Sequence, residues 1–210
     1  MRNFIRDNGL TLALSAMFLL SLVGMALTGH SARNQELIEH GQAAIRFAAY
    51  LSGGDFLSAL FENWESEFLQ MAVYVVLTAM LLQRGSAESR DPDAPEREDD
   101  EVAWGAHHPI LAWLYERSLG IALALLFIAS FGLHWRFSMV KANEQAAHHG
   151  REAQSALDYL GDSQLWFECF QNWQSEFLST AVLVVLSIFL RHRRSPESKP
   201  VGARHAETGA

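Results

Sequence analysis

The sequence contains a single cysteine, Cys169, among its 210 residues. An intrachain disulfide is therefore excluded, and with it the class of small secreted folds that depend on disulfides. The motifs G-x-x-x-x-G-K-[ST], G-x-G-x-x-G, H-E-x-x-H, C-x-x-C and G-x-S-x-G, which mark common nucleotide, metal and hydrolase sites, are also absent. We therefore predict a protein that is not an enzyme, holds no cofactor and binds no nucleic acid.

Charged residues are scarce in four stretches of the chain, at 10–28, 68–82, 119–133 and 177–190. A bilayer core needs roughly 20 consecutive apolar residues in a helix. The first stretch meets this length when it is extended to 9–28, and the third nearly does. The second and fourth are shorter, so each is either a span that draws flanking polar residues toward the core or a buried helix.

The two halves of the sequence are similar to each other. Residues 1–90 align with 110–199 without a gap, and 28 of these 90 pairs are identical. The agreement is densest around the phrase N-W-x-S-E-F-L, which occurs in both halves. Its shared polar and aromatic residues are Asn63, Trp64, Ser66, Glu67, Asn172, Trp173, Ser175 and Glu176. This pattern indicates an internal repeat with units 1–90 and 110–199.

The repeat decides how the first apolar stretch is interpreted. By composition it resembles a cleavable signal peptide, but its counterpart lies in mid-chain, so we predict a retained span. The fold class expected is an all-α integral membrane protein. Its four transmembrane helices come from two parallel two-span repeats, with amphipathic interfacial helices on the extracytoplasmic side. The predicted spans are 9–28, 66–83, 117–136 and 175–191.

Basic residues set the expected orientation. Arginine and lysine gather in the N-terminal segment, between the repeats and in the tail, whereas the two segments within the repeats have few. Both termini are therefore predicted to lie in the cytoplasm, with the protein in the cell membrane. The linker 85–109 is acidic, and the tail 195–210 is polar, so both are predicted to be disordered.

The repeated phrase has two interpretations. In the structural one, Asn63 and Asn172 cap helix N-termini and the tryptophans lie at the membrane boundary. In the functional one, Glu67 and Glu176 are drawn toward the hydrocarbon and form a symmetric proton or cation site. His40 and His149 could join them as metal ligands. The histidines without a matched partner, including His134, are interpreted as surface residues.

The phrases N-W-[EQ]-S-E-F-L and R-x-S-x-E-S-[RK] together resemble an uncharacterised family of small bacterial multi-pass membrane proteins. The resemblance covers nearly the whole chain and implies a bacterial membrane protein of about this size. It implies no activity and no site residues. Relative to the family-like phrase R-G-S-P-E-S-K, Ala87 replaces the proline in the first copy and Arg194 replaces the glycine in the second.

Two functions fit these observations. The first is a non-catalytic inner-membrane protein, with a role in the cell envelope or in partner binding, whose only assigned partner is the lipid bilayer. The second is a small proton or cation transporter or channel that uses Glu67 and Glu176 at the repeat interface. Four helices enclose little space, so this alternative implies a homo-oligomer.

Overall fold

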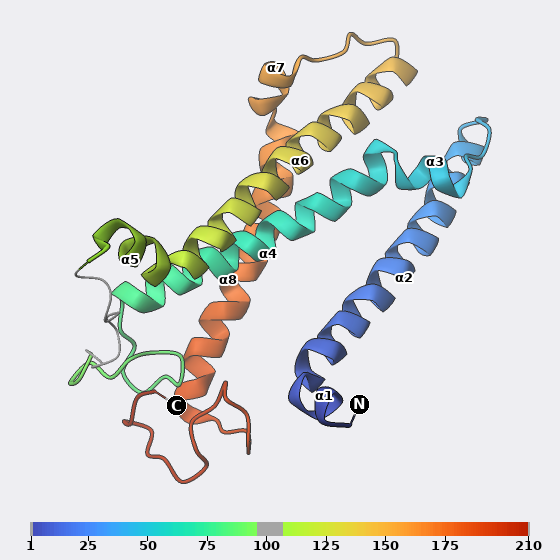
Figure 1. The fold of residues 1–210 in the computed structure, drawn as a ribbon. Helices are drawn as coiled ribbons and strands as arrows, with labels where there is room; N and C mark the ends of the chain where they lie inside the picture. The colour runs from blue at the N-terminus through green and yellow to red at the C-terminus, as the bar shows by residue number, and fades with distance from the viewer. Residues whose placement is uncertain (1, 96–106, 210) are drawn as a thin grey trace. The chain divides into compact units, whose positions relative to one another are not determined.

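The computed structural model describes residues 2–95 and 107–209. This part of the chain is helical and contains no strand (Figure 1), so the predicted all-α class is confirmed for it. The helices are α1 (Arg2–Asp7), α2 (Gly9–Glu39), α3 (Phe47–Leu51), α4 (Gly54–Met80), α5 (Pro109–Glu116), α6 (Ser118–His148), α7 (Ala156–Leu160) and α8 (Ser163–Phe189).

Two of the described helices, α2 and α6, are long and apolar enough to cross a membrane. Only 6% of the most apolar window of α2 and 17% of that of α6 is buried. Apolar surface exposed on this scale favours association with a membrane. The predicted spans 66–83 and 175–191 fall largely within α4 and α8. These helices do not combine the length and composition of a span, so the presence of four spans stays a prediction.

Helices α4 and α8 are each continuous through the repeated phrase. The N-terminus of α8 is capped upstream by Asp162, whose Oδ1 accepts a hydrogen bond from the Gln164 amide at 2.8 Å. The prediction that Asn63 and Asn172 cap helices was therefore wrong. The amphipathic stripes over 56–68 and 165–177 share one helical period with the apolar runs that follow them, and no glycine or proline separates stripe from run.

Three pairs of described helices have equal lengths in the two halves of the chain, whereas α1 has six residues and α5 has eight. Helices α2 and α6 have 31 residues each, α3 and α7 have five each, and α4 and α8 have 27 each. In each pair the bounds differ by the 109 positions that align the sequence with itself. The N-terminal caps are not the same in the two halves. Ser155 and Asp162 cap α7 and α8 with their side chains, whereas Arg46 before α3 makes no side-chain cap and Gly53 before α4 has no side chain to make one.

The chain divides into two compact units. The first comprises the described residues of Met1–Ala59 and Phe137–Ala153, and the second those of Leu60–Arg136 and Gln154–Ala210. In the first unit, Arg33 forms salt bridges with Glu36 on its own helix and with Asp55 at the start of α4, at 2.8 and 2.9 Å. The second unit contains the residues of the candidate site.

The repeated phrase R-x-S-x-E-S forms the turn that follows α4 and, in its second copy, the turn that follows α8. The Gln83 amide donates to Ser89 Oγ at 2.8 Å, and the His192 amide donates to Ser198 Oγ at 2.9 Å. One residue type therefore closes both turns in the same way. The recurring serines are explained by this backbone capping, as expected for an exit turn.

At one position the two turns share a left-handed backbone conformation but have different residues, which gives a test. Gly85 has φ +86° and the aligned Arg194 has φ +70°. A left-handed conformation costs a non-glycine residue about 1–2 kcal/mol. Arg194→Gly removes this strain but adds about 0.4–1 kcal/mol of unfolded-state entropy. We expect a small rise in the free energy of unfolding, measured by denaturant titration in detergent micelles.

Gly85→Ala is the matched control and should change the free energy of unfolding in the opposite direction. A Cβ at this position would approach the carbonyl oxygen of His205 to 2.6 Å, in addition to adopting the left-handed conformation. The free energy of unfolding should fall by about 1–2 kcal/mol or more. Equal effects of both substitutions would contradict this account of the turn.

The C-terminal tail contains turns and no helix in its described residues. Lys199 is buried, and its Nζ donates to the carbonyl oxygens of Arg204, His205 and Glu207 at 2.8–3.3 Å. The tail also meets the first exit turn, because the Gly85 amide donates to Thr208 Oγ1 at 2.9 Å. In the predicted linker 85–109, residues 96–106 lie outside the described residues.

Candidate functional site

A cluster of buried ionisable side chains joins three helices of the second unit. Its centre is His134 on α6, with Glu65 from α4 and with Glu168 and Cys169 from α8. His134, Glu65 and Cys169 have relative exposures of 0%, and Glu168 of 8%. Ionisable groups are rarely buried to this extent unless they are paired or bind a metal.

Both nitrogens of the His134 ring face carboxylates. Nδ1 lies 2.9 Å from Glu65 Oε2, and Nε2 lies 3.2 Å from Glu168 Oε2. A neutral imidazole can donate only one of these hydrogen bonds, so both are made when the ring is an imidazolium or when one carboxyl group carries a proton. Even an imidazolium leaves a negative excess among these three side chains. The arrangement therefore suits a further positive charge.

Each carboxylate near His134 also accepts a hydrogen bond from a neighbouring side chain of α8. Trp173 Nε1 donates to Glu65 Oε1 at 3.1 Å, and Gln164 Nε2 donates to Glu168 Oε1 at 2.9 Å. Asn172 Nδ2 donates to Oε1 of Glu62, a further carboxylate of α4, at 2.6 Å. These donors fix the orientation of the carboxylates, as outer hydrogen bonds do around metal ligands.

Two groups of side chains in the described part of the chain are close enough to hold a metal ion, and both include His134. One is Glu65, His134 and Cys169, and the other is Glu62, His134 and Glu168. In each group the candidate ligand atoms lie within 4.8 Å of one another. Imidazole, thiolate and carboxylate are the ligands of zinc and related transition metals.

A family model for a domain of unknown function, DUF6766, matches residues 1–210. The chain belongs to the DUF6766 family. The resemblance to an uncharacterised family noted in the sequence is thereby confirmed. No curated protein and no solved structure matches the sequence.

Glu67 and Glu176, the predicted proton or cation site of this DUF6766 chain, lie outside the buried cluster. Glu67 is exposed and Glu176 is half-buried. Their charges are close enough to interact, but neither belongs to a group with metal-ligand spacing in the described residues. Glu65, two positions before Glu67, lies instead on the buried face of α4.

His40 and His149 act as helix caps. His40 Nδ1 hydrogen-bonds the Glu36 carbonyl at 2.8 Å, and His149 Nδ1 hydrogen-bonds the Gln145 carbonyl at 2.8 Å. Each ring thus satisfies a carbonyl in the last turn of its own helix. Both rings are exposed. The structure does not bring them into a metal-ligand group among the described residues.

The prediction that His134 is a surface residue was wrong, because its ring is fully buried between carboxylates of α4 and α8. The cluster occupies positions at which the two halves differ. Aligned with His134, Glu168 and Cys169 are Met25, Ala59 and Leu60, and aligned with Glu65 is Gln174. A search for ionisable residues that replace apolar ones between the halves would have found three of its four members.

Proposed function

We propose that this chain is a multi-pass inner-membrane protein that binds a divalent transition metal of the zinc class through Glu65, His134 and Cys169. One observation carries the proposal. A carboxylate oxygen, an imidazole nitrogen and the only thiol of the chain lie within 4.8 Å of one another, and all three side chains are buried. Zinc bonds of about 2.0–2.3 Å place tetrahedral ligand atoms roughly 3.3–3.7 Å apart, which this spacing accommodates.

Glu168 supports the choice of ligands. It faces Nε2 of His134, on the opposite side of the ring from Nδ1 and Glu65. A metal-bound imidazole commonly donates its other N–H to a carboxylate, which fixes the ring and strengthens it as a ligand. Glu168 is suited to this role, leaving Nδ1 for the metal beside Glu65 and Cys169.

The ligand types favour zinc-class metals over magnesium or calcium. A thiolate and an imidazole are soft or borderline donors, whereas magnesium and calcium prefer oxygen ligands. Because all three ligands are buried, we propose a retained metal that clamps α4, α6 and α8 together. This role agrees with the non-catalytic function expected from the sequence.

The membrane arrangement in this proposal has four spans in two parallel repeats, with both termini in the cytoplasm. The equal helix lengths and their common offset support the repeat. The distribution of basic residues supports the orientation. His134 lies within one of the two helices that have the length and composition of a span. An ionisable residue at that position is costly and is a functional candidate by default.

Cobalt substitution tests the metal site directly. Purified protein treated with a chelator and then titrated with Co²⁺ should show a near-ultraviolet charge-transfer band from a thiolate ligand, with visible bands of tetrahedral intensity. Added Zn²⁺ should displace these bands, with one equivalent per chain. Cys169→Ser should lose the charge-transfer band, whereas the exposed-residue variant Glu67→Gln should retain it.

The single cysteine provides a second measurement that needs no variant. Zn²⁺ should protect Cys169 of the wild-type chain from alkylation in mild denaturant, and Mg²⁺ should not. Failure to observe the thiolate band and equal alkylation with either metal would together refute the proposed site.

A further inference from the structure

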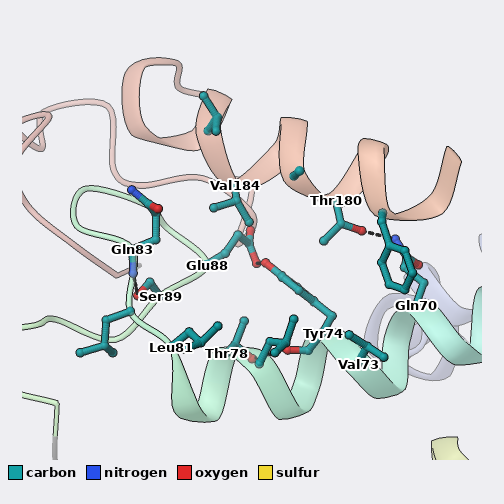
Figure 2. Close-up of a pocket in the computed structure, with 15 residues that line it drawn as sticks. Gln70, Val73, Tyr74, Thr78, Leu81, Gln83, Glu88, Ser89, Thr180 and Val184 are labelled. Atoms are coloured by element: carbon teal, nitrogen blue, oxygen red, sulfur yellow. Dashed lines mark hydrogen bonds between the residues drawn. The ribbon is translucent and has the colours of Figure 1, made fainter. Parts of the chain in front are cut away.

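The second unit contains a cavity of about 440 Å³ between α4 and α8, away from the metal ligands (Figure 2). Much of its wall is apolar and comes from both helices. These apolar residues include Val73 and Leu77 of α4, Leu81 directly after α4, and Phe177, Val184 and Val185 of α8. At one position the two helices are joined by a hydrogen bond from Gln70 Nε2 to Thr180 Oγ1.

A carboxyl group enters this apolar cavity from the exit turn that follows α4. Glu88 lines the cavity, and Figure 2 shows its carboxyl group directed toward the Tyr74 hydroxyl. Tyr74 donates a hydrogen bond to Glu88 Oε2 at 3.2 Å. The other oxygen, Oε1, is buried and has no hydrogen-bond partner within the described residues. Such an oxygen is costly to desolvate and favours a cationic partner.

The second exit turn adds another carboxylate. Glu197, the residue aligned with Glu88, lies close enough for the two charges to interact. Glu88 lines the apolar cavity, and Glu197, which is exposed and is not part of the wall, adds a second negative charge beside it. This end of the cavity is therefore complementary to a single positive charge carried on apolar groups. An anionic lipid headgroup would be repelled at the same place.

We propose that this cavity binds a lipophilic monocation, such as a quaternary phosphonium or ammonium ion, with its charge near Glu88 and Glu197 and its apolar groups between α4 and α8. The site shares no residue with the metal ligands, so it stands or falls independently of the proposed function. The features that suit such an ion are the apolar wall and the buried carboxylate oxygen of Glu88.

Protonation of Glu88 gives the site a pH dependence. Burial, and next the neighbouring charge of Glu197, raise the pKa of Glu88 above its usual range. The groups that face it are Tyr74 from α4, which donates a hydrogen bond, and Glu197 from the turn after α8. A protonated carboxyl group has no charge to offer, so cation affinity should rise as the pH rises through the raised pKa of Glu88.

Two probes of the same shape and opposite charge test whether the cavity selects for positive charge. Tetraphenylphosphonium and tetraphenylborate should be titrated separately into the wild-type chain in nanodiscs of neutral lipid, with empty nanodiscs as the blank. We expect saturable binding of the phosphonium ion that is at least about tenfold tighter than that of the borate ion. Equal affinities, or tighter binding of the borate, would overturn the proposal.

Three variants locate the binding. Glu88→Gln should weaken phosphonium binding about tenfold and remove its pH dependence. Ala181→Phe fills the cavity from α8 without changing the charge and should abolish saturable binding. Glu152→Gln, an exposed residue outside the cavity, should bind as the wild type does. If Glu88→Gln does not fold, the probe comparison and Ala181→Phe still decide, since unchanged binding in Ala181→Phe would place the ion elsewhere.

Discussion

His134→Ala is expected to lower the free energy of unfolding by about 3–5 kcal/mol, because it leaves two buried carboxylates without their imidazole partner. Glu65 is fully buried and Glu168 nearly so, and both are hydrogen-bonded to the ring. The removed ring also leaves a cavity between α4, α6 and α8, which adds to the cost. Denaturant titration in detergent micelles, monitored by circular dichroism, measures the change.

An exposed histidine gives the matched control. His108 precedes α5, its side chain makes no capping hydrogen bond, and it is exposed. His108→Ala should change the free energy of unfolding by less than about 0.5 kcal/mol. A similar loss in both variants would contradict the structure of the cluster.

A combined replacement separates stability from function. The aligned half of the chain supplies an apolar or uncharged residue at each position, which gives His134→Met, Glu65→Gln, Glu168→Ala and Cys169→Leu. Because the charges and their partners are removed together, the combined variant should be much more stable than His134→Ala alone. It should bind no metal. If the combined variant is no more stable than the single one, loss of volume outweighs loss of charge pairing at this site.

Zn²⁺ should raise the free energy of unfolding of the chelator-treated wild-type chain. A ligand that binds only the folded state adds about 2.7 kcal/mol when its free concentration is 100 times the dissociation constant. The thermal midpoint should therefore rise with the Zn²⁺ concentration. It should level off only if Zn²⁺ also binds the unfolded chain. Differential scanning fluorimetry at several Zn²⁺ concentrations measures this dependence.

Cys169→Ser and Gln164→Ala should reduce the Zn²⁺-dependent stabilisation to different extents. Cys169→Ser removes the thiolate and should abolish the Zn²⁺-dependent stabilisation. Gln164→Ala removes only the hydrogen bond to Glu168 Oε1, and outer-sphere changes of this kind weaken metal binding about 10–100-fold. Stabilisation of all three proteins to the same extent would mean that Zn²⁺ binds at another place.

The proposed metal accounts for the burial of a charged cluster, whose free-energy cost packing alone does not offset. Replacing a buried charge network with apolar residues of similar volume is often neutral or stabilising. The aligned half of the chain has such residues at three of the four positions. The cluster at Glu65, His134, Glu168 and Cys169 is therefore not required by the fold of a repeat unit. A bound cation would supply the charge that offsets its burial.

Much of the architecture follows from local sequence signals. The helical class, the two long apolar helices and the turns formed by R-x-S-x-E-S are each specified within a few residues, by apolar periodicity and by serine side chains that bond nearby backbone groups. The continuity of α4 and α8 was less evident, because an amphipathic stripe and an apolar run were interpreted as two elements. The absence of a breaking residue between them was the better signal.

The metal centre depended on the tertiary structure. His134 and Glu65 are separated by 69 positions and His134 and Glu168 by 34, and no local rule states which faces of three helices meet. The sequence by itself determined the helical class, the two long apolar helices and the similarity of the two halves, but not where α4 and α8 begin. Only tertiary packing decided that Glu65, His134 and Cys169 converge, because a buried charge is stabilised by partners brought from other helices and not by its sequence neighbours.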